Sequence, residues 1–259
     1  MTKQKNACYT EKACNLSKTE KEGKTKMYSK ESIKKVIMLM DNKIAFYKRI
    51  KNPKDVKICI SKGNRKIGKV LNVSLPPIKT CANCSGCMWL CYDVKACLQY
   101  PDTVIDARVR NYILAMNFRN EFFERIRETL SRRRKNKFFR WHVSGDIPDM
   151  DYFENMIAIA KDFPDFRFWT YTKNYKLVNE YCDKNGKESI PENLSIMFSE
   201  WRGMPMENPY NFPVFHVVFE DDENKPDPKK SHYCPGNCDI CLKTGRGCPY
   251  RESTNCHAH

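Results

Sequence analysis

Fourteen cysteines, most of them in two dense groups, constrain this chain of 259 residues more than any other feature of its sequence. Four thiols lie within residues 81–91, and further thiols occupy residues 234–256. The first residues, Met1–Asn6, precede no apolar segment, so no secretory signal is expected. Clustered cysteines in an intracellular chain bind metal more often than they form disulfides. We therefore expect an intracellular protein with metal-bound thiolates.

The remaining composition bears on possible partners. The longest aliphatic run, residues 36–40, is far shorter than the roughly 20 residues of a membrane span, so no membrane partner is expected. A net charge of +15 is compatible with a nucleic-acid partner, because phosphate contacts dominate such binding. The densest basic run, Arg132–Lys137, is expected to end a helix, where cations favour the negative end of the dipole. A nucleic-acid or nucleotide contact is the alternative interpretation of this run.

Hydrophobic periodicity predicts an α/β domain. Helices are expected at 29–49, 103–134, 149–161 and 175–183, and strands at 56–61, 69–75, 137–144, 166–172, 193–199 and 214–219. Alternation of strand and helix favours a parallel sheet with covering helices. We expect four parts: a flexible leader (1–28), the α/β domain (29–220), a linker (221–230) and a cysteine-rich module (231–259).

The first cysteine group consists of Cys81, Cys84, Cys87 and Cys91. Thiolates are soft ligands that select zinc or iron–sulfur clusters. Structural zinc sites usually take two close pairs separated by a spacer, whereas these four thiols lie on one expected tight loop. That arrangement favours a [4Fe–4S] cluster. Three thiolates would leave one iron open, either Cys84, Cys87 and Cys91 or Cys81, Cys87 and Cys91.

The order of elements around this loop resembles the radical S-adenosylmethionine enzymes. In that superfamily a cysteine loop follows the first barrel strand, and a Gly-Gly-Glu-Pro-like turn after the second strand holds the amino group of the cofactor. Here the loop follows strand 69–75, and Ser144-Gly145-Asp146 follows strand 137–144. The resemblance implies a partial (β/α) barrel, S-adenosylmethionine as cofactor and Asp146 as the carboxylate that pairs with its ammonium group. The superfamily spacing is Cys-x3-Cys-x2-Cys, whereas this chain has Cys-x2-Cys-x3-Cys.

A closer resemblance, from about Lys69 to the last cysteines, is to the Gene product 88 family of bacteriophages and mobile elements. The residues that carry it are Cys81, Cys87, Cys91-Tyr92, Arg140-Trp141-His142-Val143-Ser144-Gly145-Asp146, Tyr171-Thr172-Lys173 and the terminal cysteines. The resemblance implies a phage or prophage origin, and hence the cytoplasm of a bacterial host. It also implies that Cys81, Cys87 and Cys91 are the core metal set. It supplies no reaction.

The second cysteine group is Cys234, Cys238, Cys241 and Cys248. Four thiols within a short segment can close one fully ligated site. We expect either structural zinc or a second, auxiliary iron–sulfur cluster there.

Further candidates come from the rule that residues at the carboxyl ends of parallel barrel strands face the site. Alternation along strand 137–144 places Arg140, His142 and Ser144 on one face. The full set of expected cofactor-binding residues is Ser144, Gly145, Asp146, Tyr92, His142, Lys173 and Glu200. A hydrogen-bonded interior histidine is the alternative for His142, and a surface acid is the alternative for Glu200.

Two functions of different class follow. The first is a phage iron–sulfur enzyme of radical S-adenosylmethionine type, acting on an unknown substrate with an electron donor such as a flavodoxin or ferredoxin. The second is a non-catalytic zinc protein that binds nucleic acid through a basic surface. The Ser144–Asp146 turn favours the enzyme, whereas the cysteine spacing and the positive charge favour the zinc protein.

Overall fold

A computed structural model describes residues 27–257 of the chain. The described residues form one seven-stranded sheet in which neighbours follow chain order. Its strands are β1 (Ile60–Ser61), β2 (Leu71–Val73), β3 (Phe138–Trp141), β4 (Arg167–Thr172), β5 (Leu194–Ser199), β6 (Val214–Val218) and β7 (Thr254–His257). β1 is antiparallel to β2, and every other pair is parallel. The expected α/β class is therefore confirmed.

The described α-helices number eight. They are α1 (Lys30–Tyr47), α2 (Cys84–Cys87), α3 (Tyr92–Gln99), α4 (Asp106–Asn117), α5 (Arg119–Ser131), α6 (Met150–Asp162), α7 (Tyr175–Asn185) and α8 (Cys238–Thr244). Those with a strong apolar period lie where expected, for example α6, which Asp149 caps by accepting a hydrogen bond from the Tyr152 N–H (2.9 Å). No helix within residues 27–257 has both the length and the apolar character that a membrane crossing needs.

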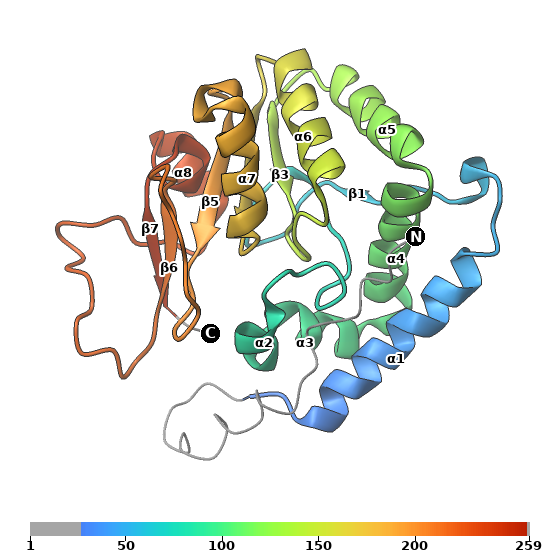
Figure 1. Cartoon of the computed structure of the whole chain (residues 1–259), viewed down its shortest axis with the longest axis horizontal. Helices are drawn as coiled ribbons and strands as arrows, with labels where there is room; N and C mark the ends of the chain where they lie inside the picture. The colour runs from blue at the N-terminus through green and yellow to red at the C-terminus, as the bar shows by residue number, and fades with distance from the viewer. Residues whose placement is uncertain (1–26, 258–259) are drawn as a thin grey trace.

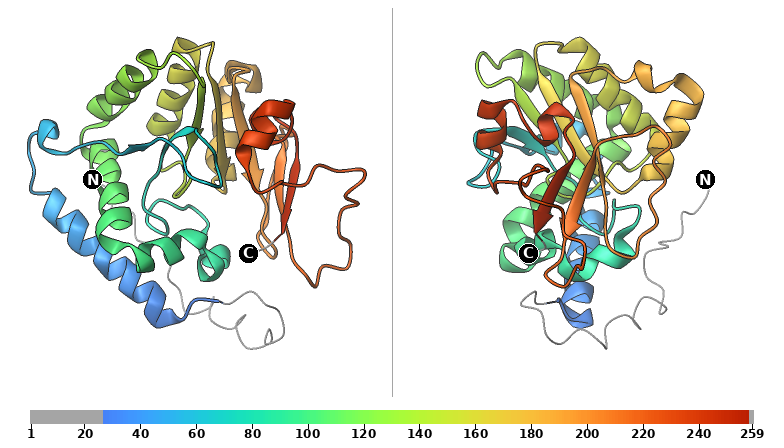
Figure 2. Two further views of the ribbon diagram at one scale, coloured as in Figure 1. Left: turned by 180° about the vertical axis from the view of Figure 1, so that it is seen from behind. Right: turned by 90° about the vertical axis from the view of Figure 1, so that its left-hand side faces the viewer.

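The two faces of the sheet carry different layers. Phe139, Phe168 and Phe198 point to the main core, where α6 and α7 cover the sheet (Figure 1). Residues one position along each strand, such as Trp169 and Met197, point to the opposite face, because side chains alternate along a strand. That inner face is covered by the C-terminal segment, with α8 on the side away from α6 and α7 (Figure 2).

Two expectations about helices were wrong. The long helix expected over residues 103–134 is interrupted at Phe118, whose dihedral angles (φ −138°, ψ 50°) leave the helical region. The Arg119 side chain donates from Nε to the Ala115 carbonyl (3.1 Å), which supplies the hydrogen bond that the break removes. Within the first cysteine group, expected on a tight loop, Cys84 and Cys87 lie on the short helix α2, whereas Cys81 and Cys91 lie outside the helices.

The carboxyl-terminal region also differs in organisation from the expected module. Residues 254–257 form β7, which pairs in parallel with β6, so the second cysteine group is attached to the same sheet as the first. The expected leader falls almost wholly outside the described residues. Tyr28, the last residue of that leader, donates its backbone N–H to the Trp89 carbonyl (2.8 Å).

Candidate functional site

The first candidate site lies at the carboxyl-terminal edge of the sheet, where the ends of β2, β3, β4 and β5 meet the segment that carries the first cysteine group (Figure 1). Asn83 of this segment donates its side-chain N–H to the carbonyl of Lys173, the residue directly after β4 (2.6 Å). This bond ties the cysteine segment to the edge of the sheet.

Three thiols of this segment, Cys81, Cys87 and Cys91, interact electrostatically. Burial raises the pKa of Cys81 well above its ordinary value, and the charges of Asp146, Cys87 and Cys91 raise it further. Burial, then Cys87, raises the pKa of Cys91 to about 11. Cys84 is buried at the start of α2, with its sulfur 3.9 Å from the Ile78 carbonyl oxygen. Cys81, Cys87 and Cys91 therefore lie within electrostatic range of one another.

The Ser144–Asp146 turn is packed directly against this cysteine segment. Gly145 has a φ of +79°, and a Cβ there would lie 2.6 Å from the Thr80 hydroxyl and 2.8 Å from the Leu75 Cβ. Only glycine fits both the backbone angle and the space. The Asp146 N–H also donates to the Thr80 hydroxyl (3.3 Å), one residue before Cys81.

The Asp146 carboxylate is buried and partly satisfied within the chain. It accepts hydrogen bonds from the backbone N–H groups of Ile147 (2.7 Å) and Lys173 (2.8 Å). Burial raises its pKa, while hydrogen bonds from Thr172, Lys173 and Ile147 act in the opposite direction. A carboxylate oxygen can accept more than one hydrogen bond, so Asp146 keeps acceptor capacity toward the thiol segment.

A buried ion pair holds the other side of the turn. Asp93 of α3 is 2% exposed and forms two hydrogen bonds with the Arg108 guanidinium. Asp93 also accepts from the Ser144 hydroxyl (2.5 Å). The Ser144 side chain is therefore directed at Asp93. Its role in the site is to hold the turn in position.

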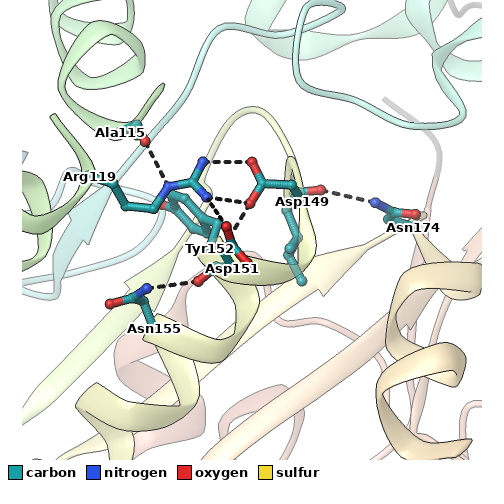
Figure 3. Close-up of polar contacts among 8 residues, drawn as sticks. Ala115, Arg119, Asp149, Asp151, Tyr152, Asn155 and Asn174 are labelled. Carbon is teal, nitrogen blue, oxygen red and sulfur yellow. Dashed lines mark hydrogen bonds and ion pairs between the residues drawn. The ribbon is translucent and has the colours of Figure 1, made fainter. Parts of the chain in front are cut away.

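The loop after the turn is fastened to two helices, as Figure 3 shows. Arg119, at the start of α5, forms two hydrogen bonds to the Asp149 carboxylate (2.8 and 2.7 Å). The side-chain N–H of Asn174 donates to the carbonyl of Ile147 (3.1 Å). Asp146 lies between residues fixed on both sides, so its carboxylate is preorganised.

Polar side chains from β4 and β5 complete the edge. Lys173 donates from Nζ to the Ser199 hydroxyl (2.9 Å) and lies over the Trp201 ring at 5.7 Å. Glu200 pairs with His216 of β6. Tyr175, which donates its hydroxyl to the Ser199 carbonyl, has its pKa raised by burial and then by the charges of Asp146, Cys87 and Glu200.

His142 does not share a face with Arg140, contrary to the expected alternation. Its φ of +51° ends the extended backbone of β3 and turns the ring toward the main core. There it contacts the Thr170 hydroxyl (3.4 Å) and the Tyr152 hydroxyl of α6 (3.1 Å). Burial and the charge of Arg140 lower its pKa to about 3. This is the environment of a neutral, hydrogen-bonded interior histidine.

Tyr92 lies between the two cysteine groups. Its residue surface is half exposed, and the Lys66 ammonium lies 5.7 Å from its ring centre. Desolvation of the phenol raises its pKa to about 12, against the effect of the neighbouring Arg140 charge. Tyr92 thus directly follows Cys91 in the chain, and its phenol lies within electrostatic range of Arg140.

The second cysteine group lies against the inner face of the sheet. Arg140 of β3 stacks on Tyr171 of β4 (4.7 Å) and hydrogen-bonds Cys238. The Tyr171 hydroxyl hydrogen-bonds Cys248, and the Ser195 hydroxyl donates to the Cys248 carbonyl (2.6 Å). Burial raises the pKa of Cys238 and of Cys248, and these two donors act in the opposite direction, toward the thiolate form that binds metal.

Sequence reasoning missed two members of this neighbourhood. Cys256, on β7, hydrogen-bonds Cys234. His232 places Nε2 3.8 Å from the Cys241 sulfur, and a Cβ on Gly247 would lie 2.7 Å from that nitrogen. The signal that could have identified them is the presence of cysteine and histidine in one short segment. Asp93 and Tyr175 carried no comparable signal, because their contacts join distant parts of the chain.

The chemistry of both groups suits metals, but neither group is already arranged as a coordination site. Within residues 27–257, no three histidine, cysteine, aspartate or glutamate side chains converge as ligands of one ion. Thiolates are the ligand type that zinc ions and iron–sulfur clusters prefer, and several of them lie near one another in each group.

Comparison with known proteins supports one assignment. Searches of the curated proteins and of the solved structures found no match to this chain. The sequence profile of one family, described as Gene product 88, matches residues 45–230, which include the first cysteine group, the Ser144–Asp146 turn and most of the sheet. The chain therefore belongs to the Gene product 88 family.

Proposed function

We propose that this chain is an iron–sulfur protein of a bacteriophage or mobile element that acts in the bacterial cytoplasm as a radical S-adenosylmethionine-like enzyme. One observation carries the proposal: three mutually interacting thiols, Cys81, Cys87 and Cys91, lie beside the buried carboxylate of Asp146 at one edge of a parallel sheet. The sequential order of β2 to β7 supports a partial (β/α) barrel.

In this proposal Cys81, Cys87 and Cys91 hold a [4Fe–4S] cluster and leave one iron free of protein ligands. When bound, the cluster would supply the electron for reductive cleavage of S-adenosylmethionine, and an external flavodoxin or ferredoxin would replace that electron. The substrate is unspecified. The protein's own contribution is to position these groups and to keep water out.

Asp146 has the clearest role among the residues of this chain. Its carboxylate would accept hydrogen bonds from the cofactor's ammonium group, since its position is fixed by the N–H groups of Ile147 and Lys173. Gly145 allows the turn to approach the cysteine segment closely enough for a shared ligand. Ser144 would act through Asp93, as a positioning residue.

Lys173, Tyr92 and Glu200 are proposed to line the cofactor pocket from the ends of β4, α3 and β5. Lys173 is near enough to Ser199 and Trp201 to present a cation beside the cofactor. His142 is proposed to support the site from behind, through Thr170, rather than by direct contact. At the second cysteine group we propose structural zinc or a second iron–sulfur cluster held by Cys234, Cys238, Cys241 and Cys248.

The decisive experiment is the metal and sulfide content of protein purified without oxygen, with its visible spectrum. The variant Cys81→Ser/Cys87→Ser/Cys91→Ser should lose about four irons and four sulfides per chain relative to the wild type. The control, Cys59→Ser, removes a half-buried thiol outside both groups and should retain them. Colourless protein that contains only zinc and takes up no iron would overturn the proposal.

The assignment of Asp146 has its own test. Asp146→Asn should weaken S-adenosylmethionine binding about tenfold or more, because one charge-assisted hydrogen bond is lost, while the iron content stays unchanged. Asp151→Asn, a substitution at a carboxylate that is 80% exposed, is the matched control. Unchanged affinity in the Asp146 variant would exclude the turn as a cofactor site.

A zinc-only result would favour the second candidate, a zinc protein that binds nucleic acid. The observation on its side is the charge of +15 together with two arginines just after α5, Arg133 and Arg134, that form no ion pair with any residue from 27 to 257.

A further inference from the structure

A cavity of about 410 Å³ lies at the edge of the sheet opposite to the first cysteine group. The end of α5 and the segments that lead into β3 and β4 form its walls, including Arg133, Arg134, Lys137 and Phe163. Its volume exceeds that of a single phosphate and falls within the range of small-molecule sites, about 300–1,000 Å³.

The basic side chains around the cavity outnumber the acidic ones that could pair with them. Its two acids are already engaged, Asp165 by Lys137 (2.8 Å) and Asp162 by Arg127 (2.9 Å). Neither Arg133 nor Arg134 forms an ion pair with any residue of the described chain. The Nε atom of Arg133 is also shielded from solvent and has no hydrogen-bond partner there. A buried donor without a partner costs free energy, so this site favours an anionic ligand.

The end of α5 is capped by backbone groups. The carbonyls of Glu128 and Leu130, near the end of α5, accept hydrogen bonds from the backbone N–H groups of Arg132 and Arg133. The two guanidinium groups that line the cavity are therefore not consumed in capping the helix.

Two aromatic residues, Phe163 and Phe166, line the same cavity as these cations. Phe166 is 4% exposed and packs edge-on against Phe163, with ring centres 5.7 Å apart. Phe163 is only half-buried, so part of its ring remains available. Cations beside an exposed ring are the combination that binds a nucleotide, because arginine pairs with phosphate and every base has a stacking face.

We propose that this cavity binds one nucleotide unit, with Arg133 and Arg134 on the phosphate and Phe163 under the base. The unit is either a free nucleotide or one residue of a nucleic-acid strand. The site is separate from both cysteine groups and does not depend on the radical S-adenosylmethionine-like function proposed above.

The test measures binding of AMP and of a fluorescent twelve-nucleotide oligo-dT to the full-length protein. Arg133→Gln/Arg134→Gln should weaken binding about tenfold or more, because two charge-assisted contacts are lost. The matched control is Arg132→Gln, in which a neighbouring arginine that is 78% exposed, pairs with Glu128 and does not line the cavity is replaced. It should change affinity less than about twofold. Far-UV circular dichroism establishes that each variant is folded.

The two sources of the nucleotide are separated by the same data. A free-nucleotide site binds AMP and gains nothing from the longer strand. A strand site binds the oligonucleotide more tightly, with an affinity that falls steeply between 50 and 200 mM salt. The proposal is overturned if the wild type binds neither probe at millimolar concentration, or if the double variant and Arg132→Gln behave alike.

Discussion

The two cysteine groups use the same residue type but are held by different forces. The first is attached to the sheet edge by polar contacts, above all the buried Asp93–Arg108 pair and the hydrogen bonds of the Ser144–Asp146 turn. The second is pressed against the inner face by apolar contact with Trp169 and Met197, and β7 anchors it by strand pairing. The segment of the first group has no strand pairing of its own, so it should adjust to a ligand more readily than the second group, which β7 anchors to the sheet.

The largest effect is expected where the second group meets the sheet. Trp169→Ala removes a side chain with no exposed surface and should lower the free energy of unfolding by about 4 kcal/mol. Alkylation followed by mass spectrometry should show faster labelling of Cys238 and Cys248, with labelling of Cys81 unchanged. Trp169→Phe is the control, because the Trp169 indole N–H has no partner to lose. If Trp169→Ala accelerated labelling equally in both cysteine groups, the two groups would not be anchored separately.

The next effect tests the polar anchor of the first group. Asp93→Asn leaves the Arg108 guanidinium, 17% exposed, without its counter-charge and should cost about 3 kcal/mol of unfolding free energy. In this variant Cys91 and Cys97 should be alkylated faster, while Cys248 is alkylated at the wild-type rate. Urea unfolding measures the stability, and Asp151→Asn should cost less than about 1 kcal/mol, because the exposed pair with Arg119 is screened by water. A cost as small as that of the control would mean that Asp93 does not anchor this region.

The smallest effect concerns pH and the histidine behind the first group. The pKa of His142 is about 3 in the folded protein, against an ordinary value of 6.5. Between these values the unfolded chain binds a proton that the folded chain does not, so the free energy of unfolding falls as the pH falls. From pH 7 to pH 5 this residue should account for a loss of about 2 kcal/mol.

The control for this prediction is His142→Gln, measured by urea unfolding at both pH values. Carboxylates titrate in both proteins and contribute similarly, so the difference between the two losses isolates the histidine. If both proteins lose the same stability between pH 7 and pH 5, the ring is already solvated in the folded state.

Elements with a strong apolar period could be predicted from the sequence. Helix α6 and strands β4 and β5 lie where expected, because their periodic residues face one continuous core. Strand β7 could not be predicted in this way: Thr254 and Asn255 are polar, yet they are buried by pairing and by the segment that leads from the second group. The break at Phe118 was likewise invisible, since it depends on the contact of Arg119 with Asp149, thirty residues away.

The neighbourhood of Cys81, Cys87, Cys91 and Asp146 was expected from the order of elements, because the carboxyl ends of parallel strands meet at one edge. The orientation of side chains at that edge was not. The positive φ of His142 reverses the face that simple alternation assigns to it. Only the folded chain brings Asp93 of α3 to the hydroxyl of Ser144.

The strictly sequential order of the sheet has a consequence for how the protein is made. From β2 onward, each strand pairs with the one that precedes it in the chain, so every new strand leaving the ribosome finds its partner already synthesised. The first group of thiols is exposed early in this process, whereas the inner face of the sheet stays open until β7 arrives. The second group can therefore reach its folded arrangement only after β7 has been synthesised.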